Sequence, residues 1–206
     1  METTLNSLEI VTLTKDIVLM IAAIAAAHAA INGLKTWSHE LKGKADFEVA
    51  RSLARATYKL RDEVRGCRSG WYHPSEFPTE YDSFEKDPIE KAKAYHYLYQ
   101  QRWKYVSEAL QIFEAQALEA EALWGSTSKI KTDEFRQCVR NLQVSIDAYV
   151  SDIASSGEDF KSDKEFAKSV KNDIWAGKED ENELSLKINN AVKEIELYVQ
   201  PHFRRS

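Results

Sequence analysis

The feature that most constrains this chain is an uncharged run of eighteen residues near the N-terminus, residues 17–34. Such a run has the length of a helix that crosses a lipid bilayer. Seven of its residues are alanine, and it contains His28 and Asn32, so its hydrophobicity is only moderate. We expect a short N-terminal segment, residues 1–16, followed by a transmembrane helix over residues 17–34.

Two other interpretations of the run stay open at this stage. It also fits an Ala-rich helix buried inside a soluble helical bundle, and Ala27-His28-Ala29 resembles the cleavage site of a signal peptide. Against the signal peptide, the segment before the run has a net charge of −2, whereas a signal peptide begins with a positively charged region.

The charges after the run predict its orientation. Residues 35–68 carry nine Lys or Arg against five acidic residues, a net charge of +4. Basic flanks stay on the cytoplasmic side of a membrane, so we expect residues 35–206 to be cytoplasmic. Cys67 and Cys138 would then lie in a reducing compartment, and both fall on apolar helical stripes, which favours buried free thiols over a disulfide.

Small residues within the run predict self-association. Ala25, Ala29 and Gly33 recur at four-residue spacing and would let two helices approach closely in lipid. His28 and Asn32 are also four residues apart, so both would lie on one helix face and could bond to a partner helix. These residues predict a homo-oligomer, although alanine-rich composition alone produces the same pattern.

The remainder of the chain reads as long helices. Gly and Pro number only 7 and 4, about 5% of the chain against roughly 12% on average. We predict an all-α fold: the transmembrane helix, then a cytoplasmic helical bundle built on a long antiparallel hairpin. One arm carries a seam of apolar spacing from Ala50 to Cys67; the other starts at Asp87-Pro88 and runs to Trp124. Its predicted seam is Ile89, Ala92, His96, Tyr99, Trp103, Val106, Leu110, Phe113, Ala117, Ala120 and Trp124.

Three shorter helices are expected to complete the bundle. Their predicted starts are Thr132, a capping box formed by Ser162 and Glu165, and Asn182. No stretch alternates apolar and polar residues for long enough to predict a sheet.

The connection over residues 67–87 is unusually aromatic. Large apolar side chains in a loop are normally covered, so they would either cap the end of the helical hairpin or form a binding surface for a protein partner. The side chains concerned are Trp71, Tyr72, Phe77, Tyr81 and Phe84.

Basic residues after the run have two interpretations as well. Lys42, Lys44, Arg51 and Arg55 could contact anionic lipid head groups, which act only near the membrane surface. Alternatively, the basic helix pairs with the acidic remainder of the chain, because residues 69–206 have a net charge of −7.

Local motifs for chemistry are absent from the sequence. There is no spacing typical of a metal site, no phosphate-binding glycine loop, no nucleophile elbow and no dinucleotide fingerprint. The net charge of −5 also argues against nucleic acid as a partner. We therefore expect no catalytic residues, no metal and no cofactor.

One resemblance adds to this interpretation. Leu41-Lys42-Gly43-Lys44, followed by Ala56-Thr57-Tyr58-Lys59-Leu60-Arg61-Asp62, resembles a group of uncharacterised bacterial single-span membrane proteins, in which an N-terminal span precedes such segments. The resemblance covers roughly residues 15–70. It implies an inner-membrane location and a helical cytoplasmic part, and no activity.

The leading hypothesis is a membrane-anchored, non-catalytic scaffold or interaction protein whose partners are the lipid bilayer, a second copy and a further protein. Two alternatives remain. One is a membrane-perturbing effector of a toxin or phage-defence system. The other is a soluble helical-bundle protein or enzyme with a buried Ala-rich helix, which predicts a buried His28.

Overall fold

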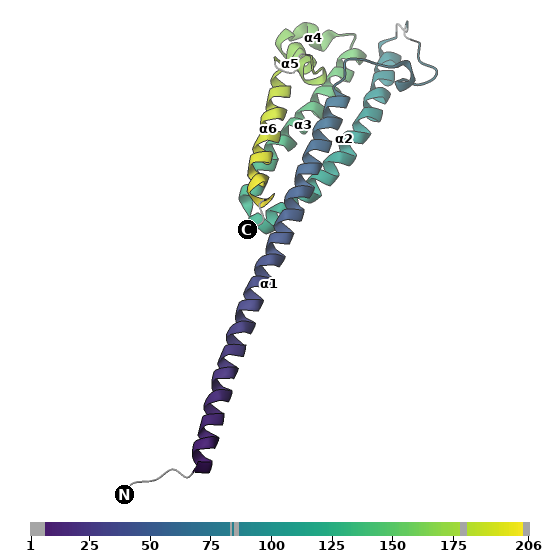
Figure 1. Ribbon diagram of the computed structural model, residues 1–206. Helices are drawn as coiled ribbons and strands as arrows, with labels where there is room; N and C mark the ends of the chain where they lie inside the picture. The colour runs from purple at the N-terminus through teal and green to yellow at the C-terminus, as the bar shows by residue number, and fades with distance from the viewer. Residues whose placement is uncertain (1–6, 83, 85–86, 178–180, 204–206) are drawn as a thin grey trace. The chain divides into compact units, whose positions relative to one another are not determined.

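A computed structural model describes residues 7–82, 84, 87–177 and 181–203, with side chains from Ile10 onward. Every regular element within these residues is helical, which confirms the all-α prediction (Figure 1). The α-helices are α1 (Ser7–Cys67), α2 (Pro88–Trp124), α3 (Ser126–Ala154), α4 (Glu158–Ser162), α5 (Lys164–Ile174) and α6 (Glu183–Val199), with short 3-10 helices η1 (Pro74–Glu76) and η2 (Gln200–Phe203).

The chain divides into two units after Ala45. The N-terminal unit consists of the α1 residues up to Ala45, and the core unit begins at Asp46 and contains all later elements. Packing therefore begins later than the boundary predicted at residue 35. The predicted N-terminal segment is also not separate from the apolar run, because α1 already includes residues 7–16; residues 1–6 lie outside the described part.

The two arms of the predicted hairpin run antiparallel within the core unit. Arg102, in the first half of α2, donates from Nη1 to the carbonyl oxygen of Cys67 at 3.4 Å. At the other end of α2, the indole nitrogen of Trp124 donates to Oδ1 of Asp46 at 2.9 Å. The start of one arm thus lies beside the end of the other. Helix α3 packs against α2, α5 and α6, and Figure 1 shows α3 next to both α2 and α6.

Capping side chains explain where the helices begin. Asp87 accepts from the backbone nitrogen of Ile89 at the start of α2, and Asn182 accepts from Ser185 at the start of α6, as predicted. The capping box predicted at Ser162 is wrong: Asp163 caps α5 by accepting from Phe166, and Ser162 ends a separate short helix, α4.

Helix α3 starts before its predicted position at Thr132. Gly125 adopts φ 81° and ψ −170°, a conformation that side chains disfavour, and this allows the chain to leave α2 and enter α3 at Ser126 within a single residue. Residues 126–131, which precede the predicted start, are therefore already helical.

The core of this unit is one large apolar cluster. Ala50, Leu53, Leu60, Val64 and Cys67 of α1 are all buried in it, which confirms the predicted seam. Phe113 of α2 and Phe135 of α3 meet edge to face there, with ring centroids 5.5 Å apart. On α2 the predicted seam is only partly right, because Ile89 and His96 are exposed while Ala94 and Ala109 are buried.

A buried arginine joins three helices at one end of the core unit. Arg68, only 3% exposed, donates to the backbone carbonyls of Asp173 and Asn172, in the last turn of α5, at 2.6 and 3.1 Å. It also donates to Oδ1 of Asn182 at 2.7 Å and to the hydroxyl of Ser185 at 2.9 Å, both at the start of α6. The guanidinium thus supplies donors to helix-end carbonyls that have no partner within α5.

Candidate functional site

The apolar run of α1 is exposed throughout the N-terminal unit. An eighteen-residue window of α1 reaches a mean hydropathy of 2.1, and none of that window is buried. Helix α1 is therefore long and apolar enough to cross a membrane. The alternative of an Ala-rich helix buried among the chain's own helices is not what the structure shows, since His28 and its neighbours are exposed.

Polar side chains along this part of α1 are bonded within the helix. Asn32 Nδ2 lies 3.0 Å from His28 Nε2, which confirms that these two residues share a face. The hydroxyls of Thr14 and Thr36 donate to the carbonyls of Ile10 and Asn32. Such bonds reduce the cost of placing polar groups in hydrocarbon.

The predicted packing face is open to an external partner. Ala25, Ala29 and Gly33 are all exposed, and a Cβ atom added at Gly33 would have no neighbouring atom within 4 Å. The structure therefore gives Gly33 no packing role within the described chain.

The aromatic loop divides into covered and exposed side chains. The Tyr72 hydroxyl lies 3.0 Å from that of Tyr99 and accepts from the Trp175 indole at 2.8 Å. Phe77 also packs against the core, and Tyr81 stacks on Phe77 with ring centroids 4.8 Å apart. Trp71 and Phe84, in contrast, are 89% and 84% exposed. Capping of the helix ends thus accounts for three of the five predicted residues, and the other two remain accessible.

Arg102 fixes the position of this loop. Its guanidinium donates to the carbonyls of Ser69 and Trp71, each at 2.6 Å, and to Oε2 of Glu76 at 2.7 Å. It also lies over the ring of Tyr72, 5.1 Å from the centroid. Burial raises the pKa of the Glu76 carboxyl, but the hydrogen bond and the charge of Arg102 outweigh burial and hold that pKa below its usual value.

This ion pair predicts a dependence of stability on pH. Because the pKa of Glu76 is lower in the folded chain, its stabilising contribution is complete above the ordinary glutamate pKa and is lost as the pH falls through the folded value. We expect Glu76→Gln to lower the melting temperature at neutral pH, at roughly 2–4 °C per kcal/mol, and to lower it less at an acidic pH below the ordinary glutamate pKa. Thermal unfolding of the full chain in detergent measures this; Glu80→Gln, an exposed change on the same loop, is the control. An equal loss at both pH values would contradict the assignment.

The predicted basic residues are exposed, and their ion pairs are local. Lys42, Lys44, Arg51 and Arg55 all face solvent. Arg51 lies 3.7 Å from Glu48 of its own helix, so its pairing is not with the acidic part of the chain. Lys59 likewise pairs with Glu63 of α1 at 2.9 Å.

The two cysteines are free and buried, as predicted. Burial raises the pKa of the Cys67 thiol to about 12 and that of Cys138 to about 11. Both thiols are therefore protonated at neutral pH and poor nucleophiles. Among the described residues, no three His, Cys, Asp or Glu side chains lie close enough together to hold a metal ion.

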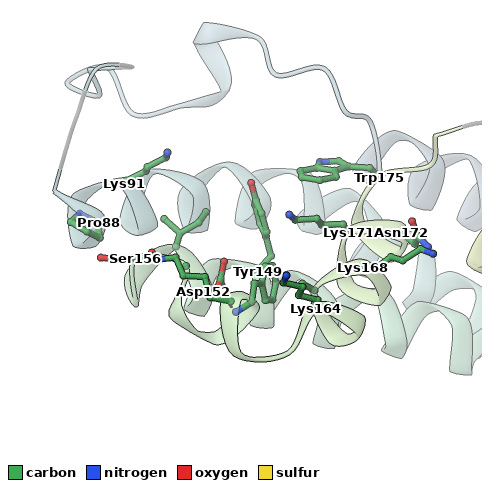
Figure 2. Close-up of a pocket in the computed structure, with 15 residues that line it drawn as sticks. Pro88, Lys91, Tyr149, Asp152, Ser156, Lys164, Lys168, Lys171, Asn172 and Trp175 are labelled. Atoms are coloured by element: carbon green, nitrogen blue, oxygen red, sulfur yellow. Dashed lines mark hydrogen bonds between the residues drawn. The ribbon is translucent and has the colours of Figure 1, made fainter.

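Sequence reasoning missed a lysine-lined hollow of about 1060 Å³ in the core unit. Figure 2 shows Lys91 of α2 and three lysines of α5 around it, with Tyr149 of α3 and Trp175. Its five lysines are Lys91, Lys161, Lys164, Lys168 and Lys171. A signal was present in the sequence, because the last four recur at spacings of three, four and three residues, and the three on α5 therefore lie on one face of that helix.

Comparisons of the chain with protein-family models, with curated proteins and with solved structures found no match. The resemblance to bacterial single-span membrane proteins therefore stays a prediction. The functional argument rests on the exposed part of α1, the aromatic loop and the lysine-lined hollow.

Proposed function

We propose that this chain is a single-span protein of a bacterial inner membrane that holds a cytoplasmic helical bundle at the membrane as a non-catalytic interaction scaffold. The observation that carries the proposal is the exposed apolar part of α1. Its large side chains, among them Ile17, Ile21 and Ile24, lie 45–63% exposed, with no partner surface among the residues that the structure describes. Soluble monomers rarely expose a continuous apolar surface of this size, and a bilayer covers it along its whole length.

The charges of α1 support the orientation. Residues 35–68 have a net charge of +4, which favours the cytoplasm for the part of the chain that follows the span. Lys42 and Lys44 are exposed and lie about 12–15 Å beyond residue 34 by helical rise. That distance exceeds the Debye length of about 8–10 Å, so their attraction to anionic lipid head groups is largely screened at physiological salt.

The scaffold acts through two kinds of contact. In the membrane, Ala25, Ala29 and Gly33 form a face without bulky side chains, on which a second copy can pack closely. In the core unit, Trp71 and Phe84 are large exposed side chains on a loop that Arg102 holds in place. Aromatic side chains of this kind are concentrated at protein interfaces.

Self-association through the small face gives a matched test. Ala29→Leu places a bulky side chain on the face, whereas Ala27→Leu makes the same chemical change about 200° around the helix. We expect crosslinking in intact cells to trap dimers or larger oligomers of the unmodified chain and of Ala27→Leu, and several-fold fewer of Ala29→Leu. Mass spectrometry of the crosslinked species identifies any second protein bound. Monomers in all three samples without any crosslinked partner would contradict a scaffold.

A further inference from the structure

The lysine-lined hollow combines positive charge from two separate regions of the core unit. Lys91 comes from the start of α2, whereas Lys161, Lys164, Lys168 and Lys171 come from α4 and α5. A solvated face on a single helix would not bring Lys91 to the same place. The packing of α3 against both α2 and α5 holds the two regions around one volume (Figure 2).

Acidic side chains of the same segment do not balance this charge inside the hollow. Residues 158–171 contain four acids and four lysines, yet none of those four acids lines the hollow. The one lining carboxylate, Asp152, is buried and accepts from the backbone nitrogen of Phe160 at 2.8 Å. Among the described residues, Lys91, Lys164 and Lys168 have no carboxylate within ion-pair distance.

All five lysines are exposed, so the repulsion between them is modest. Lysines at three- and four-residue spacing repel one another along a helix, and the remainder of the chain is acidic. The five lysines are therefore clustered in a protein whose net charge is negative. A bound polyanion removes the repulsion between these lysines.

The lining residues and the volume of the hollow indicate which kind of anion fits it. Its volume of about 1060 Å³ is large enough to hold a small molecule. Tyr149, Phe160 and Trp175 form an aromatic part of the lining. Lysine acts on phosphate as a strong point charge, and the three ammonium groups without an ion-pair partner among the described residues match several phosphate charges better than a single carboxylate. Lys161 donates to the carbonyl of Ser156 and Lys171 lies over the ring of Phe160.

We propose that this hollow binds a soluble small anion that carries at least two phosphate groups. Lys164 and Lys168 hold the phosphates from α5, and Lys91 faces them from α2. Two sources share this chemistry: a nucleoside di- or triphosphate, whose ring would lie against the aromatic wall, and an inorganic polyphosphate. The site is independent of the scaffold proposal, because it lies entirely within the core unit.

The test is calorimetric titration of the full chain in non-ionic detergent with sodium triphosphate and with ATP, both at one fixed ionic strength. Lys164→Gln/Lys168→Gln removes two charges from the hollow. Lys104→Gln/Lys193→Gln removes two charges from exposed sites that do not line it. We expect the first double variant to weaken binding at least tenfold and the second to leave it within about twofold of the unmodified chain. Far-UV circular dichroism checks that both double variants are folded.

Tighter binding of ATP than of triphosphate assigns the site to nucleotides, and the reverse order assigns it to inorganic polyphosphate; either result supports the proposal. The absence of binding to the unmodified chain at millimolar concentrations overturns it. Equal weakening in the two double variants also overturns it, because the effect would then be one of overall charge. Unchanged binding in Lys164→Gln/Lys168→Gln would show that the anion binds elsewhere.

Discussion

Replacing Arg68 by methionine is expected to lower the free energy of unfolding by about 3–5 kcal/mol. The guanidinium is buried and bonds two carbonyls of α5 and two side chains of α6. Methionine fills a similar volume but donates no hydrogen bond, so those four acceptors lose a donor within the core, at about 1–3 kcal/mol for each one left unsatisfied.

The loss of stability should also include contacts that Arg68 does not make itself. Asn182, which accepts from Arg68, also caps α6 and donates to the carbonyls of Asn172 and Trp175 at 2.6 and 3.3 Å. Burial raises the pKa of the Asp173 carboxyl, and the positive charge of Arg68 opposes that rise. Without Arg68, the ends of α5 and α6 lose both their donor and a compensating charge.

Urea unfolding of the full chain in detergent, followed by circular dichroism, measures the change. Arg55→Met is the matched control, because Arg55 is exposed on α1, which ends one residue before Arg68, and its replacement should change the free energy of unfolding by less than about 0.5 kcal/mol. Equal effects of the two substitutions would contradict a structural role for the Arg68 network.

Replacing Ile24 by lysine is expected to prevent most of the chain from inserting into membranes. On the scale of helix insertion, isoleucine is slightly favourable at the centre of a span and lysine costs about 3 kcal/mol, a difference of about 3–4 kcal/mol. That difference corresponds to a shift of more than two orders of magnitude in the insertion equilibrium. Seven alanines make this span only moderately hydrophobic, so its favourable free energy of insertion is too small to offset the added lysine.

Leu118→Lys is the matched control for this change. Leu118 is a large, 62% exposed apolar residue on α2 in the core unit. The substitution introduces the same charge outside the span, so the chain should remain in the membrane fraction. If Ile24→Lys and Leu118→Lys distribute alike between the soluble and membrane fractions, residues 17–34 do not form the anchor.

Sequence periodicity predicted the core best where one helix face packs along its whole length. The seam from Ala50 to Cys67 is buried at every predicted position. On α2 the same reasoning placed His96 in the core, although it is exposed. Because α2 meets α3 on one side and the α1 arm on another, its buried stripe is broader than a single seam and includes Ala94 and Ala109.

Local sequence patterns could not predict contacts between residues that are far apart in the sequence. Arg68 is one of the nine basic residues within residues 35–68, and nothing in its sequence neighbourhood indicates partners more than a hundred residues later. The division of the aromatic loop has a similar cause, since Tyr72 is covered by Tyr99 and Trp175 from distant elements. The spacing of the lysines in α4 and α5 was visible in the sequence, but only the fold places Lys91 opposite them.

Extraction of membranes with alkaline carbonate tests the central claim most directly. Carbonate strips peripheral proteins from bilayers and leaves integral ones in place. The account predicts that the unmodified chain stays in the membrane pellet at its full mass of 23.6 kDa. Release of intact chain into the soluble fraction, or a shorter soluble product cleaved within residues 17–34, would contradict it.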